Sequence, residues 1–291
     1  MTESYRALTE DVALVDLPRD VLLVTGGDAG AFLQGQLSAD VDALGSRLGS
    51  SADTLLLQPT GKVEALLRVT RWVDGFLLDV DAGWGEAVQA RLRRFLLRMD
   101  VAIEALPWRC LALRGPKAHE VDTGALGLPA DWPAWPGVDV LGEDPPRPEG
   151  VPEATLDDYE AARVEAGVPR MGAELDERTI PAEAGVVERA VSFTKGCFVG
   201  QELVARIDSR GGNVPRRLRG VVVAGDAVPP VGAEVVAGDR EVGRITSAVR
   251  SPARGPVALA YLGRAVEVPA PVVVRWEGRE ASAEARPLPL A

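Results

Sequence analysis

The chain has 291 residues, of which 46% are hydrophobic, and a formal net charge of −11 at pH 7. This length predicts one to three domains, and the composition suffices for a sizeable core. The acidic balance argues against a general nucleic-acid-binding surface, so we expect no stable nucleic-acid binding. A local basic patch stays open at Arg216-Arg217-Leu218-Arg219, where a solvated strand edge is the simpler interpretation.

The cysteines and the histidine limit the metal chemistry. Cys110 and Cys197 lie far apart and form neither a disulfide framework nor a CxxC motif. With His119 they are too few for a structural zinc site or a four-cysteine cluster within one chain. We expect no metal site of the chain's own, and any cluster would need ligands from a second subunit or another protein.

The sequence contains no run of about 18 uncharged apolar residues that would cross a membrane. Residues 1–5 also lack the basic region of a signal peptide. We therefore expect a cytoplasmic protein that does not contact a membrane.

Hydrophobic patterning in the first 113 residues predicts short strands interrupted by two helices. One helix is expected over 29–37, with Asp28 as its N-cap, and the other over 85–99. The strands are expected at 13–16, 21–25, 54–58, 63–70, 76–80, 101–104 and 110–113. Cys110 falls in the last strand, where an inert core residue is expected.

The second half begins with a proline-dense stretch at 129–152. Prolines at this density exclude a central strand or a helix interior, so we expect a surface loop that tucks Trp132 and Trp135 inward, with a lid or linker as alternatives. A helix over 156–166 follows, capped by Thr155 and ended by Gly167. After a boundary near 209–213, runs at 220–224, 234–237, 241–247, 257–262 and 272–276 predict a small antiparallel barrel.

The stretch Lys195-Gly196-Cys197-Phe198-Val199-Gly200-Gln201-Glu202 places a thiol between two glycines at the start of an expected helix. A neighbouring Lys195 and the positive end of a helix both favour the thiolate of Cys197. The chemistry indicated is a reactive or ligand-donating sulfur. A buried, inert cysteine in a glycine-punctuated turn is the alternative, and this spacing does not decide between them.

Several motifs resemble the YgfZ branch of the aminomethyltransferase (glycine cleavage T-protein) superfamily. The most specific is the cysteine stretch at 195–202, which is the signature of that branch. The remaining motifs lie at 32–40, 59–63, 111–116, 163–169 and 183–185.

The resemblance implies an α+β fold of two interleaved ferredoxin-like lobes and a C-terminal antiparallel β-barrel around a central channel. We expect residues 1–50 and 107–209 to form the first lobe with the cysteine signature, 51–106 the second lobe, and 210–291 the barrel. It further implies tetrahydrofolate, or a folate derivative, as the ligand. The partners implied are iron–sulfur client enzymes, tRNA-modifying ones included, or cluster-assembly proteins.

The resemblance also assigns site residues. Glu165 in the Arg-x-Glu-Ala-Gly motif is expected to bind the pterin ring, because a carboxylate can accept two adjacent N–H donors. Arg163 is expected to orient Glu165 and to take part in cofactor binding. Cys197 is expected to carry the branch-specific chemistry, and Lys195 to tune it or contact the folate tail.

One departure bears on activity. Aminomethyltransferases carry paired acids in the meander where this chain has Ala65 and Leu66, and Glu64 stands one residue early, which on a strand points it to the other face. The enzymes' Gly-Tyr-Thr-Gly-Glu motif is also missing. The prediction is therefore an accessory protein for assembly or repair of iron–sulfur enzymes. The alternatives are a folate-dependent one-carbon (aminomethyl or methyl) transferase and a non-catalytic interaction module.

Overall fold

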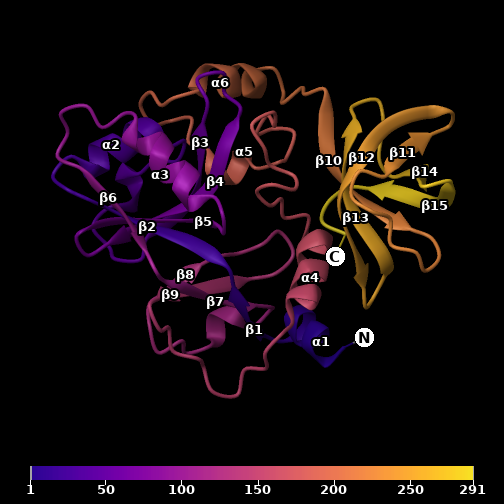
Figure 1. Cartoon of the computed structure of the whole chain (residues 1–291), viewed down its shortest axis with the longest axis horizontal. Helices are drawn as coiled ribbons and strands as arrows, with labels where there is room; N and C mark the ends of the chain where they lie inside the picture. Colours follow the sequence, from indigo (N-terminus) through magenta and orange to yellow (C-terminus); the bar gives the residue numbers. More distant parts are fainter. Residues whose placement is uncertain (1, 291) are drawn as a thin grey trace.

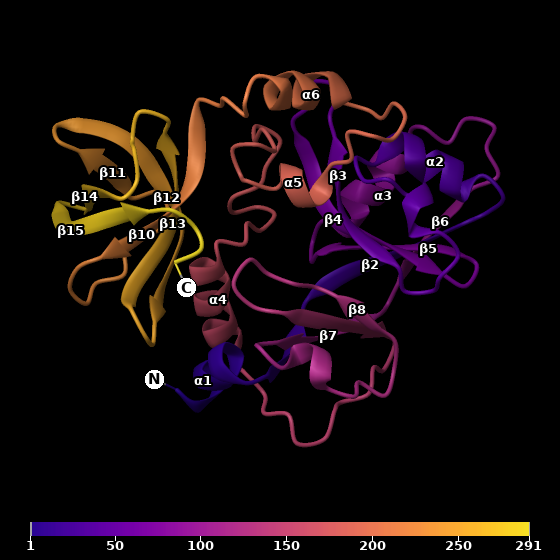
Figure 2. The ribbon, with the colours of Figure 1, turned by 180° about the vertical axis from the view of Figure 1, so that it is seen from behind.

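The computed structural model describes residues 2–290, which form three bodies around a common centre (Figures 1 and 2). These are a five-stranded sheet, a four-stranded sheet and a closed six-stranded barrel. Helix α4 (Leu156–Ala166) stands between the four-stranded sheet and the barrel. The predicted α+β architecture of two lobes and a C-terminal antiparallel barrel is confirmed.

The five-stranded sheet has the order β3-β4-β5-β2-β6. Its core is aliphatic because alternate residues of the strands face α2 (Ala29–Gln36) and α3 (Gly85–Arg93). Asp28 is the N-cap residue of α2 as predicted, but its carboxylate makes no capping hydrogen bond and instead accepts a bond from the backbone N–H of Asp100. The strands are β2 (Arg19–Thr25), β3 (Ser51–Leu57), β4 (Val63–Trp72), β5 (Gly75–Asp81) and β6 (Ala102–Leu106).

The four-stranded sheet corrects the interpretation of the proline-dense stretch. Its order is β1-β7-β9-β8, so β9 (Gly137–Gly142) is a central strand. The prolines lie just outside β9, at Pro136 and Pro145, where they bound the strand instead of interrupting it. The other strands are β1 (Ala13–Leu17), β7 (Arg109–Arg114) and β8 (Gly127–Pro129).

The chain passes from the four-stranded sheet to the five-stranded sheet earlier in the sequence than expected. Strand β2 pairs with β5 and β6, and α2 packs on the same sheet, so residues 19–50 lie with 51–106 and not with 107–209. The reason is local, because Pro18 separates β1 from β2 and the chain changes sheets there. Helix α1 (Glu3–Glu10), which the patterning missed, packs against α4.

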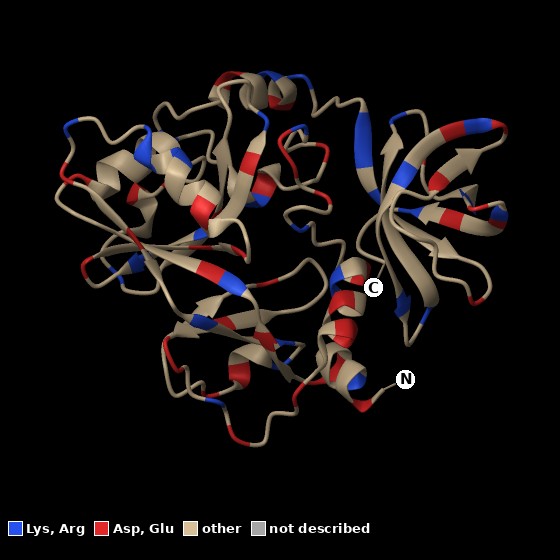
Figure 3. Cartoon of the chain, viewed as in Figure 1, with Lys and Arg blue, Asp and Glu red and all other residues tan. Residues whose placement is uncertain are grey.

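The barrel closes in the order β10-β13-β12-β11-β14-β15. Strand β15 (Arg279–Arg286) was missed because its residues are mainly small or charged and not β-branched. Acidic and basic residues alternate along the ribbon of all three bodies (Figure 3). The basic run 216–219 lies on β10 (Arg216–Val223), which β15 pairs only from Gly220 onward, so the run forms a strand edge as expected. The remaining barrel strands are β11 (Glu234–Ala237), β12 (Arg240–Ser251), β13 (Gly255–Gly263) and β14 (Ala270–Trp276).

A chain of buried charges joins the two sheets. Arg68 of β4 binds Asp79 of β5 (2.8 Å) and Asp139 of β9 (3.1 Å), and Asp139 binds Arg114 of β7 (2.7 Å). Burial opposes ionisation of Asp139, yet Arg114 and Arg68 hold its pKa below the usual value. The five-stranded sheet is thereby held to the four-stranded sheet through charges that depend on one another.

We expect Asp139→Ala to lower the free energy of unfolding by about 3–5 kcal/mol, because it leaves Arg114 buried without its carboxylate. Urea denaturation followed by circular dichroism measures this loss. Asp226→Ala is the control, since Asp226 is 99% exposed in its pair with Arg250 and should leave the midpoint unchanged. Equal effects of the two substitutions would contradict a structural role for the buried chain.

Candidate functional site

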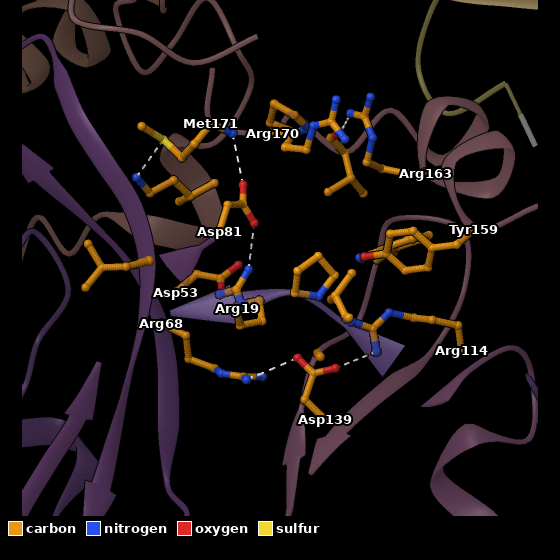
Figure 4. A pocket seen from close by; sticks show the side chains of 18 of the residues that line it. Arg19, Asp53, Arg68, Asp81, Arg114, Asp139, Tyr159, Arg163, Arg170 and Met171 are labelled. Atoms are coloured by element: carbon orange, nitrogen blue, oxygen red, sulfur yellow. Dashed lines mark hydrogen bonds and ion pairs between the residues drawn. The ribbon is translucent and has the colours of Figure 1, made fainter. Parts of the chain in front are cut away.

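A cavity of about 810 Å³ opens between the two sheets and α4 (Figure 4). The buried charges form its floor, and β3, β4 and β5 contribute one wall. The opposite side is formed by α4 and by residues 168–172 that follow it. Cavities of this size are typical of small-molecule sites, and this one lies at the junction of two sheets, where such sites often occur.

The sheet wall carries an acid and an aliphatic residue side by side. Asp81, at the end of β5, accepts a bond from Arg19 (2.8 Å) and another from the backbone N–H of Met171 (2.9 Å). The sulfur of Met171 in turn accepts a bond from the backbone N–H of Leu66 on β4 (3.3 Å). Both Leu66 and Asp81 line the cavity.

The helix side of the cavity is aromatic and charged. Trp132 and Tyr159 meet edge to face with ring centroids 5.0 Å apart, and both line the cavity. Burial raises the pKa of Tyr159 to about 12, so its hydroxyl stays a donor. The prediction that the proline-dense stretch turns its tryptophans inward is borne out for Trp132 and for Trp135, which is buried.

Arg163 lies in the cavity wall but does not orient Glu165. Its guanidinium binds Glu160 (2.7 Å), Glu174 (3.1 Å) and Ser247 of the barrel (2.8 Å). Glu174, which is fully buried, also accepts bonds from Thr246 (2.8 Å) and Ser247 (2.6 Å). Arg163 thus ties α4 to the barrel, and this role could not be read from the motif because Glu174 and the barrel are distant in sequence.

Glu165 is not among the residues that line this cavity. One carboxylate oxygen accepts a bond from the Tyr5 hydroxyl of α1 (2.6 Å), and burial together with this bond raises the pKa of Tyr5. The other oxygen, Oε1, is buried without a hydrogen-bond partner. The backbone carbonyl of Glu165 accepts a bond from the N–H of Leu290 (2.6 Å), so residues 287–290 close over this end of α4.

The cysteine loop packs on the five-stranded unit and not on the lobe that was expected to carry it. The ammonium of Lys195 donates to the carbonyls of Gln34 (2.6 Å), Leu37 (2.8 Å) and Ala39 (2.7 Å), at the C-terminal end of α2. Gly200, at φ 82°, approaches the carbonyl of Gln58 so closely that a Cβ would lie 2.5 Å from that oxygen. These contacts determine the position of the loop.

Cys197 is exposed on this loop, whereas Cys110 is buried. The expectation for Cys110 is therefore confirmed, and burial raises the pKa of its thiol well above the usual value. Helix α6 (Gln201–Ser209) begins shortly after Cys197, as the pattern predicted. Lys195 uses all three of its N–H donors on carbonyls, and burial lowers its pKa to about 8.

The position of Glu64 follows from a β-bulge. Pairing of β3 with β4 shifts between Leu56 and Leu57, and Glu64 is left without an opposite residue. Its carboxylate binds Arg91 of α3 (2.6 Å) and does not line the cavity. The chain therefore offers no acid at the Ala65 and Leu66 positions, and Glu64 does not replace one.

The fold matches that of a glycine cleavage system enzyme. Over 99% of this chain and 89% of the other, it superimposes on aminomethyltransferase T from Bartonella henselae with a TM-score of 0.83 at 21% identity. Residues 216–291 match the family described as the glycine cleavage T-protein C-terminal barrel domain.

Sequence relatives define the family. An aminomethyltransferase of Rubrobacter xylanophilus is 30% identical over 91% of this chain and 78% of that protein. An uncharacterized protein of Haemophilus influenzae is 30% identical over 78% of this chain and 80% of its own length. The chain belongs to the aminomethyltransferase (glycine cleavage T-protein) superfamily. It is also similar to the mitochondrial iron-sulfur cluster assembly factor IBA57 homolog of Pyricularia oryzae, at 28% identity over 85% of this chain and 69% of that protein.

The described residues 2–290 contain no helix long and apolar enough to cross a membrane. Within the same range, no three His, Cys, Asp or Glu side chains are grouped so as to hold a metal ion.

We expect Lys195→Met to lower the free energy of unfolding by about 1–3 kcal/mol, because three carbonyls lose their donor. The rate at which iodoacetamide alkylates Cys197 should not change, since the ammonium is bound to the three carbonyls. The buried Cys110 does not interfere with this measurement. A slower alkylation in the variant would instead assign Lys195 to the activation of Cys197.

Tyr5→Phe should destabilise the fold by about 1–3 kcal/mol, because both carboxylate oxygens of buried Glu165 would then lack a donor. In the background of Glu165→Gln the same substitution should cost less, since no charge is left unpaired. Chemical denaturation of the four proteins of this double-mutant cycle gives the coupling. Additive effects would show that the bond between Tyr5 and Glu165 contributes nothing.

Proposed function

We propose that this protein binds tetrahydrofolate and acts as an accessory factor in the assembly or repair of iron–sulfur enzymes, using Cys197 as its thiol. The observation that carries the folate part is Glu165 Oε1. This oxygen is buried and has neither a hydrogen bond nor an ion pair within residues 2–290. Glu64 Oε2 is the other buried carboxylate oxygen of that range without a hydrogen bond, but it pairs with Arg91. An orphaned buried acceptor of this kind calls for a donor that the chain does not supply.

The residues present fit a folate. The cavity beside α4 is large enough for a pterin ring, and it combines flat aromatic walls at Trp132 and Tyr159 with the carboxylates of Asp81 and Glu160. Aromatic faces favour stacking of a flat ring, and carboxylates accept its N–H donors. Bound tetrahydrofolate would supply a carrier of one-carbon units. Glu165 lies on α4 outside the cavity lining, so we propose that its unpaired Oε1 holds the pterin edge where the ring reaches past α4, and that Arg163 keeps α4 in place beside it.

Two observations favour an accessory role over a one-carbon transferase. Leu66 lines the cavity wall where the enzymes of the superfamily carry an acid, and Glu64 is turned toward Arg91. Cys197 is exposed on a loop that Lys195 and Gly200 hold in place, so the thiol can meet a partner protein. Similarity to an iron–sulfur cluster assembly factor homolog supports iron–sulfur proteins as the partners. Iron–sulfur enzymes that modify tRNA are proposed to be among them. The cytoplasm is the proposed location.

Isothermal titration calorimetry with tetrahydrofolate tests the ligand. We expect the wild type to bind with a Kd of about 1–10 μM and Glu165→Gln to bind at least about tenfold more weakly, because a charge-assisted acceptor becomes a neutral amide. Absence of binding to the wild type would remove folate from the proposal. Retained affinity in the variant would place the pterin away from Glu165.

The thiol is tested separately in cells. Cys197→Ser should keep the unfolding midpoint, since the side chain is exposed and nearly isosteric, but it should abolish support of iron–sulfur enzyme activity. Cys110→Ser is the matched control for thiol chemistry at a buried position. Normal client activity in cells that carry only Cys197→Ser would rule out a role for this thiol.

A further inference from the structure

Asp81 is a carboxylate aimed into the cavity. Its side chain is 30% exposed, although it lies at the end of β5 next to the buried floor. Arg19 binds one oxygen at 2.8 Å, and the backbone N–H of Met171 binds the other at 2.9 Å (Figure 4). Arg19 is itself held by Asp79 at 2.6 Å, so the group that orients Asp81 does not swing freely.

Asp81 still has acceptor capacity that the protein does not use. A carboxylate offers about four lone-pair positions, and two are taken by Arg19 and Met171. Because the side chain faces the cavity, the unused positions point to where a ligand would lie. Arg19 and Met171 fix the Asp81 carboxylate in one position in the cavity wall. The carboxylate therefore selects ligands that present an N–H to its free lone pairs.

The other acids of the cavity wall are either already bound or not held in one orientation. Asp131 is bound by His119 and by the backbone N–H of Gly137, and Asp157 is exposed with no hydrogen bond from the described residues to orient it. Glu160 receives Arg163 on both oxygens, at 2.7 Å and 2.8 Å. Asp53 pairs with Arg189 at 2.7 Å in a pair whose two side chains are each about one-third exposed. Asp139 is buried between Arg68 and Arg114. Asp81 therefore combines a fixed orientation with open acceptor positions.

We infer that Asp81 is the residue by which the cavity distinguishes a reduced pterin ring from an oxidised one, an inference that rests on the proposed binding of folate. A tetrahydropterin carries N–H groups at ring positions 5 and 8. The fully oxidised ring has bare nitrogens there, whose lone pairs would face the carboxylate. With ring positions 5 and 8 turned toward Asp81, and not the N3–H and amino donors that both rings share, an acceptor-only group favours tetrahydrofolate over folic acid, because the bare nitrogens of the oxidised ring offer it no donor and their lone pairs repel the carboxylate.

Leu66 provides a way to move the acid without changing the cavity elsewhere. Pairing of β4 with β5 runs from Leu67 opposite Val80, so Leu66 lies one step further, beside Asp81. Both residues contact Met171: the backbone N–H of Leu66 donates to the Met171 sulfur, and the carboxylate of Asp81 accepts from the Met171 backbone N–H. An aspartate at position 66 would therefore enter the same part of the cavity from the neighbouring strand.

The experiment measures binding of tetrahydrofolate and of folic acid by anaerobic calorimetry to the full-length protein. We expect the wild type to prefer tetrahydrofolate and Asp81→Asn to bind it about tenfold to a hundredfold more weakly. Because an amide can donate as well as accept, the affinity for folic acid should fall less than the affinity for tetrahydrofolate. The preference for tetrahydrofolate over folic acid should therefore fall at least about tenfold. The double variant Leu66→Asp/Asp81→Asn should regain part of the preference.

Asp74→Asn is the matched control, since Asp74 lies exposed in the turn at the other end of the same hairpin and should change neither affinity. Thermal midpoints establish that each variant is folded, and Asp81→Ser replaces the amide variant if that one is unstable. An unchanged preference in Asp81→Asn, with tetrahydrofolate still bound, would overturn the inference alone. Absence of tetrahydrofolate binding to the wild type would overturn the proposed function as well.

Discussion

The pairing of Arg68 with Asp79 and Asp139 is the interaction on which the rest of the structure depends. Each of these side chains is almost fully buried, and a buried charge without a partner is strongly unfavourable. Arg68 and Asp79 come from the five-stranded sheet, and Asp139 comes from the other one. The two sheets can therefore meet in only one arrangement without leaving a charge unpaired, and that arrangement shapes the floor of the cavity.

A second set of buried charges fixes the third body. Glu174 accepts bonds from Arg163 of α4 and from Thr246 and Ser247 of the barrel, and its backbone carbonyl accepts the Tyr261 hydroxyl. Since Arg163 also lines the cavity, the position of the barrel and the shape of the cavity wall are coupled through one guanidinium. A ligand that moves α4 would therefore also act on the barrel.

The thiol and the cavity are built from different parts of the chain. Cys197 sits on a loop that Lys195 holds to the end of α2 and Gly200 places against the hairpin of β3 and β4, and it does not line the cavity. Strand β4 links the two, because Gly61 in the turn before it contacts α6 while Leu66 and Arg68 further along it face the cavity. A shift of β4 caused by a bound ligand would therefore reach the turn that contacts α6, next to the cysteine loop.

The sequence by itself determined the local structure. Thr155 accepts the Asp158 N–H and Gly167 adopts the left-handed conformation, so α4 has the bounds that its capping residues predicted. Alternation and turn residues placed most strands of the meander and the barrel, because these signals act between near neighbours. They failed for β8 and β9, which border or lie within the proline-dense stretch, and for β15, whose residues are mainly small or charged. The motif at 195–202 identified the exposed thiol, and the resemblance predicted the architecture.

Only the tertiary structure decided which charges meet. Nothing local to Lys195 shows that its ammonium would be taken by three carbonyls of the α2 end, or that Arg163 would bind Glu174 and not Glu165. The same holds for Asp81, whose importance arises from Arg19 and Met171, residues brought to it from two distant segments. The physical reason is that turns and periodicity are encoded within a few residues. The partner of a buried charge, in contrast, is whichever opposite charge or dipole the folded chain brings within hydrogen-bond distance in a medium that screens poorly.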